Sequence, residues 1–324
     1  MKKTIAITSA LAAASSLATA EIKINEFLSF AGFVDMSYSH TDNGGDLGDS
    51  SDNSYSIDQV EIDWLFNFGK VTGRVDVEYL GGDDEDANLE QAFVSYDLGN
   101  GSALTIGRYE SMLGLEAKEP TGLYQYSTAY EGLSGLPQYG QGVKYTGQSG
   151  DLSYGVSVQD ESFDNDANSL GGNEGLGSYS VEAAVSLASG NFTYSVGGAF
   201  EDADEAGDNS IINAHVTYVS GAWTLGAEYN IADIESNGDL EIDSWLAMAN
   251  YAYSDCCSVT ARISGIDAEN AGGDIGDAIK YTLAHNYALS DNLAVITEVS
   301  FIDGELADVD GDSTTGAVEV LFSF

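Results

Sequence analysis

The sequence has 324 residues, and its 53 acidic side chains outnumber 10 basic ones, which gives a formal net charge of −43 at pH 7. This acidity excludes a nucleic-acid-binding protein, because that class neutralises phosphates with Lys and Arg. A hydrophobic content of 43% and 19 tyrosines exclude the disordered chain that high charge alone can indicate. A surface of this sign attracts cations.

Residues 1–20 have the composition of a secretory signal peptide. Lys2 and Lys3 precede an apolar, alanine-rich stretch from Ile5 to Leu17, and Ala18–Ala20 forms an A-x-A cleavage site. The apolar stretch is too short to span a bilayer, which argues against a membrane anchor. We therefore expect an exported protein whose mature chain begins at Glu21. No later stretch approaches the ~18 uninterrupted apolar residues of a helical span.

From residue 28 onward, apolar and polar residues alternate with a period of two, the pattern of strands with one apolar and one polar face. The alternation predicts sixteen strands. They lie near residues 28–39, 59–68, 71–79, 92–98, 104–106, 143–145, 152–158, 179–187, 192–200, 212–218, 223–231, 245–253, 259–263, 279–287, 293–301 and 318–324.

The connections between these strands alternate between short and long. The longer ones are Thr41–Ser54, Gly81–Asn88, the stretch after residue 106, Asp160–Gly177, Glu201–Asn209 and Asp303–Thr314. This alternation indicates an antiparallel meander whose two ends face different surroundings. Aromatic residues gather near both ends of the strands, as in the two girdles of a membrane barrel. They are Phe66, Phe68, Phe192, Tyr251, Tyr253, Phe322 and Phe324 near short turns, and Tyr38, Tyr79, Phe200, Tyr229 and Phe301 near long connections.

Every predicted strand has an apolar face, and the sequence offers no second sheet to cover it. Lipid can cover such faces, and only helices and closed barrels cross lipid with all backbone groups paired. Short periplasmic turns and long outer loops are typical of transmembrane β-barrels. Sixteen strands also leave an aqueous channel. Residues 21–324 are therefore predicted to form an all-β, 16-stranded antiparallel transmembrane β-barrel with a pore.

Three segments carry a resemblance to a known family: LEQAFVSYDL (Leu89–Leu98), LTIGRYESMLG (Leu104–Gly114) and VEVLFSF (Val318–Phe324). They resemble a Gram-negative outer-membrane porin, and the chain is most similar to the OmpL-like β-barrel porin families. The last strand, ending in Phe324, resembles the signal read by the barrel-assembly machinery. The resemblance implies passive diffusion of small hydrophilic solutes through the outer membrane, commonly as a homotrimer, with no catalysis and no cofactor.

The connection at residues 110–138 differs from the other long connections, which are mostly Asp, Asn, Gly and Ser. It contains Met112, Leu113, Leu115, Leu123, Tyr124 and Tyr126. It is also the third long connection, and in porins the third loop folds inward and narrows the channel. The resemblance therefore implies a constriction loop at 110–138. An outward lid or a partner-binding loop is the alternative.

Strand parity assigns most charged side chains to the lumen, as expected when a base facing mid-membrane lipid costs about 2–4 kcal/mol. The lumen-facing acids are Asp35, Glu61, Asp63, Asp76, Glu78, Glu182, Glu228, Glu298 and Glu319, and the bases are Arg74, Lys144, Arg262 and Lys280. Because acidic rings favour cations, this excess of acid predicts modest cation selectivity.

Arg108 departs from the alternation, since it shares parity with the apolar Leu104 and Ile106. Either a bulge lies near Gly107, or a neighbouring protomer shields this strand. The resemblance places an arginine here in the pore, so we expect Arg108 to turn inward, and Glu110 has the same ambiguity.

A transverse field is one role for these charges. It would form if Arg108, with Arg74 or Lys144, faced acids of the third loop; salt bridges that only pin the loop are the alternative. The candidate pore-lining and constriction residues are Arg74, Asp76, Glu78, Arg108, Glu110, Glu116, Lys118, Glu119, Glu131, Lys144, Arg262 and Lys280.

Other features favour no specific chemistry. Cys256 and Cys257 are adjacent, so a disulfide between them would be strained, and two small turn residues are expected. The acidic stretch 308–312 lacks the bidentate Glu of a calcium loop and is expected to be solvated, with loose divalent-ion binding as the alternative. The three histidines, His40, His215 and His285, have no motif linking them to a serine, so an enzyme is not indicated. A receptor or adhesin barrel with acidic outer loops is the alternative function.

Overall fold

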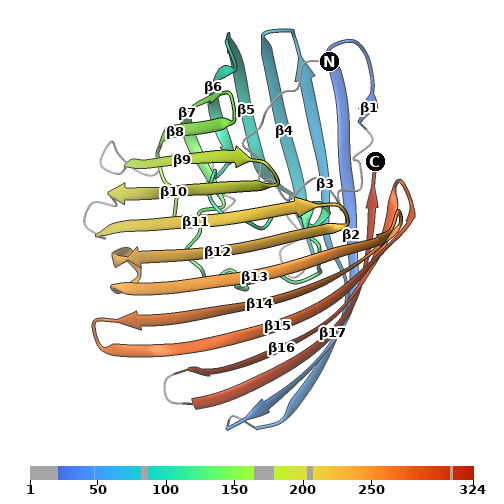
Figure 1. Cartoon of the computed structure of the whole chain (residues 1–324), viewed down its shortest axis with the longest axis vertical. Coiled ribbons are helices and arrows are strands. Elements are labelled where there is room, and N and C mark those ends of the chain that lie inside the picture. Colours follow the sequence, from blue (N-terminus) through green and yellow to red (C-terminus); the bar gives the residue numbers. More distant parts are fainter. Residues whose placement is uncertain (1–20, 47, 82–86, 164–178, 203–206, 307–308) are drawn as a thin grey trace.

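The computed structural model describes residues 21–46, 48–81, 87–163, 179–202, 207–306 and 309–324. The predicted signal peptide, residues 1–20, lies outside the described residues. The chain forms a ring of long antiparallel strands (Figure 1). The short strand β1 (Ile22–Lys23) pairs with the start of β2, and two 3₁₀ turns, η1 (Pro120–Gly122) and η3 (Glu235–Asn237), interrupt the connections.

Sixteen strands build the ring, as the alternation predicted. They are β2 (Leu28–Gly45), β3 (Ser50–Asn67), β4 (Val71–Leu80), β5 (Ala87–Gly99), β6 (Ser102–Glu110), β7 (Tyr139–Ser149), β8 (Leu152–Gln159), β9 (Tyr179–Ser189), β10 (Phe192–Asp202), β11 (Asp208–Ser220), β12 (Trp223–Ile234), β13 (Leu240–Ser254), β14 (Cys257–Asn270), β15 (Gly273–Ser290), β16 (Leu293–Leu306) and β17 (Val309–Ser323). Cys256 lies in the turn before β14, as expected, whereas Cys257 is the first residue of β14.

The ring is closed by antiparallel pairing between its first and last strands. β17 pairs with β2 from Gly311 opposite Gly45 to Ser323 opposite Phe33. Each barrel strand therefore has a neighbour on both sides, which removes the unpaired edges that an apolar solvent does not tolerate. Among the residues that the structure describes, no helix is long and apolar enough to cross a membrane.

The barrel exposes apolar side chains on its outer face and buries polar ones on its inner face. Ile212, Leu283 and Val299 are exposed, whereas Asn230 and Thr260 on neighbouring strands are buried. Aromatic pairs occur beside the short turns, such as Phe192 with Tyr218 at 4.7 Å and Trp223 with Tyr251 at 4.6 Å between ring centroids. This distribution is the reverse of that in a water-soluble protein and fits a barrel surrounded by lipid.

Two predicted connections are shorter than expected. β2 and β3 have 18 residues each, so most of Thr41–Ser54 is paired strand. β16 and β17 likewise extend into the predicted connection Asp303–Thr314. These segments consist largely of Asp, Asn, Ser, Thr and Gly, and they have no apolar face. Periodicity cannot detect a strand whose two faces are both polar, although its backbone pairs as well as any other.

The segment between β6 and β7, residues 111–138, runs inside the ring of strands (Figure 1). We call residues 111–138 the lumen loop. It contributes half of the largest cluster of buried apolar side chains, and residues of β10 to β13 contribute the other half. The predicted inward folding of the third long connection is confirmed.

Candidate functional site

The lumen loop is held first by apolar packing against the inner wall. Leu113, Leu115, Tyr130 and other loop residues pack against Ile211 of β11 and Leu246 of β13. Burying an apolar side chain of this size stabilises by roughly 1.5–3 kcal/mol. The apolar residues that distinguished this connection in the sequence therefore fix the loop to one side of the barrel.

Loop backbone amides bind carboxylates of the wall. The amide of Met112 donates to Glu182 at 2.6 Å, and that of Leu115 donates to Glu228 at 2.6 Å. The amide of Ser127 donates to Glu298 at 3.1 Å. Hydrogen bonds to ionised acceptors are stronger than neutral ones. These three inward-facing acids therefore anchor the loop.

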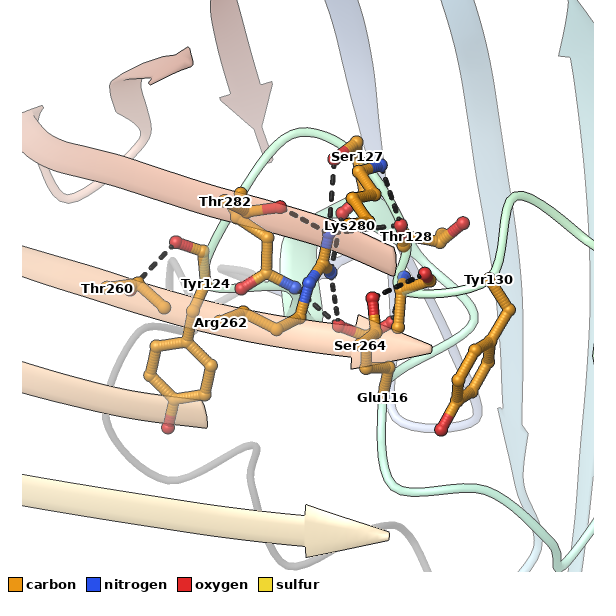
Figure 2. Close-up of polar contacts among 12 residues, drawn as sticks. Glu116, Tyr124, Ser127, Thr128, Tyr130, Thr260, Arg262, Ser264, Lys280 and Thr282 are labelled. Atoms are coloured by element: carbon orange, nitrogen blue, oxygen red, sulfur yellow. Dashed lines mark hydrogen bonds and ion pairs between the residues drawn. The ribbon is translucent and has the colours of Figure 1, made fainter. Parts of the chain in front are cut away.

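Two bases of the wall bind the loop from β14 and β15 (Figure 2). Arg262 donates to the carboxylate of Glu116 at 2.5 Å and to the carbonyls of Ser127 at 2.8 Å and Thr128 at 3.0 Å. Lys280 donates to the same Thr128 carbonyl at 3.0 Å and forms an ion pair with Glu131. Strands β9 to β16, which carry all these anchoring residues, are called the anchor wall.

Two of the three loop acids predicted to face Arg74, Arg108 or Lys144, which were Glu116, Glu119 and Glu131, have other partners in the structure. Glu116 and Glu131 bind Arg262 and Lys280 instead of facing Arg74, Arg108 or Lys144. Both pairs pin the loop, which was the alternative to a transverse field. The reason is geometric, because the parts of the loop that carry Glu116 and Glu131 lie against the anchor wall, whereas Glu119, the third predicted loop acid, lies beside Glu90 on the other side.

Three further candidate residues also have local partners. Lys144 donates to the carbonyl of Glu110 at 2.9 Å, and its ammonium lies 4.1 Å from the ring centroid of Tyr109. Glu110 ends β6 and is half-buried. Lys118 donates to the carbonyl of Pro137 at 3.1 Å within the loop. These contacts hold the two ends of the lumen loop together.

A group of carboxylates lies on the opposite side of the barrel, on β3 to β5 and the adjoining part of the loop. We call it the acidic cluster, and its members are Glu61, Asp63, Asp76, Glu78, Glu90 and Glu119. Strands β3 to β6, which face the cluster, are called the acidic wall. Arg74 lies 2.6 Å from Asp76, 3.3 Å from Asp63 and 3.9 Å from Glu61. The Arg74 guanidinium therefore forms ion pairs with three carboxylates.

Two neutral side chains connect the members of the acidic cluster. The Gln59 amide donates to Glu61 at 3.2 Å and to Glu78 and Glu119 at 3.3 Å. The Tyr139 hydroxyl lies 2.5 Å from Glu90 and 3.2 Å from Glu119. Burial, and then the charge of Glu90, raises the pKa of the Glu119 carboxyl well above its ordinary range.

Sequence alternation did not identify Glu90, Gln59 or Tyr139 as part of the site. Glu90 shares parity with Ala92 and Val94, whose face is apolar. The pairing of β4 with β5 shifts by one residue at Asp76 and Val77, and Glu90 and Gln91 are both buried as a result. Only the cross-strand pairing reveals this shift.

Arg108 is buried among groups of the acidic cluster and does not lie on the exposed apolar surface. Its Nε donates to the carbonyl of Glu90 at 3.0 Å, and its guanidinium lies 5.6 Å from the ring centroid of Tyr139. Arg108 is 8% exposed and the next residue, Tyr109, is 1% exposed, so alternation fails at this point. The pairing of β5 with β6 continues without a shift here. The irregularity is instead Gly107, whose φ of 131° is unfavourable for other residues.

Comparisons with known proteins agree with this architecture. A family model described as Gram-negative porin matches residues 6–306 of the chain. No curated protein matches the sequence.

Solved outer-membrane proteins share the fold. The outer membrane channel DcaP of Acinetobacter baumannii is 13% identical, with 92% of this chain and 97% of that chain covered and a TM-score of 0.69. The trimer form of OmpT from Vibrio cholerae is 16% identical, covering 92% and 99%, with a TM-score of 0.65. Salmonella typhi OmpF, in complex with daunomycin, is 15% identical, covering 94% and 100%, with a TM-score of 0.63. At these identities the likeness concerns the fold.

Proposed function

The chain belongs to the Gram-negative porin family, and we propose on that basis that it forms a water-filled outer-membrane channel for small hydrophilic solutes and ions. The observation that carries the proposal is the closed ring of sixteen strands with a polar inner face and the lumen loop inside it. A barrel of this size leaves space for water along its axis. The lumen loop narrows that space.

The channel prefers cations. Arg262 and Lys280 on the anchor wall are occupied by loop carboxylates and carbonyls. On the acidic wall, six carboxyl groups accompany only Arg74 and Arg108 among the described neighbours. Excess negative charge along a pore attracts cations and repels anions.

The channel works as a homotrimer, is exported by the signal peptide at residues 1–20 and is inserted by the barrel-assembly machinery. The solved trimer form of an outer-membrane barrel with the same fold supports the oligomeric state. The channel performs no catalysis. The match to the Gram-negative porin family supports this part of the proposal.

Planar bilayer recordings across a salt gradient test both parts of the proposal. We expect discrete conductance steps and a reversal potential of the cation-selective sign. A reversal potential of the opposite sign would contradict the cation preference. Swelling of liposomes with sugars and amino acids of graded size tests diffusion itself. Exclusion of even the smallest solute, or a silent bilayer with ligand binding, would favour a receptor.

A further inference from the structure

Three carboxylates of the acidic cluster converge from separate parts of the chain. Glu61 lies on β3, Glu90 on β5 and Glu119 on the lumen loop, and one oxygen from each lies within 4.8 Å of the others. Calcium binds oxygens at roughly 2.3–2.6 Å, so three of its ligands spaced evenly around it are about 4.0–4.5 Å apart, which is within this limit. One calcium ion can therefore contact all three carboxylates.

Two oxygens in this group are buried without a hydrogen-bond donor. Glu61 is 1% exposed and Glu90 is 4% exposed, and neither Oε1 of Glu61 nor Oε2 of Glu90 receives a hydrogen bond from any described residue. The nearest cation to Glu61 Oε1 is Arg74, at 3.9 Å. A buried carboxylate oxygen without a partner is costly, and a cation bound between the carboxylates would offset that cost.

The bases nearby are already engaged by other groups. Arg74 contacts Asp76 at 2.6 Å and Asp63 at 3.3 Å, and Arg108 donates to the backbone carbonyl of Glu90. A second set of close carboxylates, Glu61, Asp63 and Asp76, surrounds Arg74, so that set already has its cation. Among the described residues, the group of Glu61, Glu90 and Glu119 has only this shared Arg74, 3.9 Å from Glu61, as an ion-pair partner.

The chemistry of the group selects the ion. Its ligands are all carboxylate oxygens, without His or Cys, which is the preference of hard cations. Magnesium requires oxygens at about 2.0–2.1 Å in a near-octahedral shell, whereas calcium accepts wider and less regular arrangements. Tyr139 donates to Oε1 of Glu90 and lies 3.2 Å from Oε1 of Glu119, and Gln59 donates to Oε2 of Glu119, so both carboxylates are positioned by neutral donors, as supporting residues do around metal ligands.

We propose that Glu61, Glu90 and Glu119 bind a calcium ion that ties the lumen loop to the acidic wall. The anchor wall holds the loop through Arg262 and Lys280. The calcium ion supplies the corresponding attachment on the opposite side, where two wall carboxylates face a loop carboxylate. Loss of the ion leaves three carboxyl groups together without a shared ligand and weakens that attachment.

The test uses the full chain, purified in detergent and depleted of divalent ions, with Ca²⁺ added during calorimetry. The variants are Glu90→Gln and, as a matched control, Glu241→Gln, which removes an exposed carboxylate of β13. We expect one Ca²⁺ site in the unmodified protein and in the control, and at least a tenfold weaker affinity in Glu90→Gln. Binding at exposed surface carboxylates alone would give equal signals in all three proteins and would overturn the proposal.

Thermal unfolding provides a second readout that separates binding from folding. Ca²⁺ should raise the Tm of the unmodified protein and of Glu241→Gln, since a ligand of the folded state stabilises it. In chelator, Glu90→Gln should be at least as stable as the unmodified protein, because it removes one of three crowded charges, and Ca²⁺ should not change its Tm. An equal Tm rise in Glu90→Gln, or equal affinity for Mg²⁺, would refute the calcium site. Neither readout depends on conduction, so failure here leaves the channel proposal intact.

Discussion

The anchor wall and the acidic wall both carry buried acidic and basic side chains, yet the roles of these side chains differ. On the anchor wall, Glu228 accepts from the Leu115 amide and Arg262 binds Glu116 and loop carbonyls. On the acidic wall, Glu61 and Glu90 have oxygens without donors. Packing of the lumen loop on β10 to β13 causes this difference. Position in a strand therefore sets only which way a charge faces, whereas the loop decides whether it is a structural anchor or part of the field in the pore.

Substitution of Arg262 should have the largest effect, because this residue attaches the lumen loop to the anchor wall. Its side chain is fully buried, and Arg262→Ala removes the ion-pair partner of Glu116, the donor to the Ser127 carbonyl and one of the two donors to the Thr128 carbonyl. Loss of one partner of a buried ion pair destabilises by about 3–5 kcal/mol. We expect a large drop in Tm together with a larger and noisier single-channel conductance, because the loop loses its main attachment. Arg262→Lys should restore part of both values; an unchanged conductance would show that Arg262 does not hold the constriction.

Substitution of Gly107 tests whether its unusual backbone conformation is required beside Arg108 on the acidic wall. A Cβ at this position would lie 2.2 Å from the carbonyl oxygen of Ala92, and the φ is 131°. Gly107→Ala should therefore lower the free energy of unfolding by roughly 1–3 kcal/mol or more, as measured by chemical denaturation. The matched control is Gly190→Ala, which has a φ of 64° but open space around the Cβ. Equal losses in the two variants would mean that crowding at Gly107 is unimportant.

The two walls can be compared directly with one substitution on each. Glu78→Gln on β4 and Glu228→Gln on β12 make the same chemical change. Glu228→Gln should cost about 1–3 kcal/mol of stability, since a charge-assisted hydrogen bond becomes neutral, and it should leave the reversal potential unchanged. Glu78→Gln should shift the reversal potential toward zero with little effect on Tm. If Glu228→Gln shifted the reversal potential and Glu78→Gln lowered the stability, the proposed difference between the two walls would be refuted.

A single neutral hydrogen bond on the anchor wall should have the smallest effect. The Thr260 hydroxyl donates to the carbonyl of Tyr124 at 3.1 Å, and Asn286 donates to the same carbonyl at 2.6 Å (Figure 2 shows the Thr260 contact). Thr260→Val removes one of the two donors and should cost about 0.5–1.5 kcal/mol in thermal unfolding. Thr260→Ser keeps the hydroxyl and should be close to the unmodified protein. A loss as large as that of Arg262→Ala would mean that Tyr124 has a greater role than its contacts indicate.

The sequence by itself determined the features that depend on local pattern. Period-two alternation identified sixteen strands and the inward parity of acids such as Glu182 and Glu228. The apolar residues of the third long connection predicted that it packs against something. These inferences hold because successive side chains of a strand point to opposite faces of the sheet, whatever the rest of the chain does.

Only the tertiary structure decided which partner each charge has. Glu116 binds Arg262, which is 146 positions away, and the sequence contains nothing that distinguishes this pair from Glu116 with Arg74. Glu90 is buried because the pairing of β4 with β5 shifts by one residue, and Arg108 is buried after the unusual φ of Gly107. Register shifts and loop packing are set by contacts between distant segments. A local pattern therefore predicts the barrel, and the packing of the loop across its lumen determines the site.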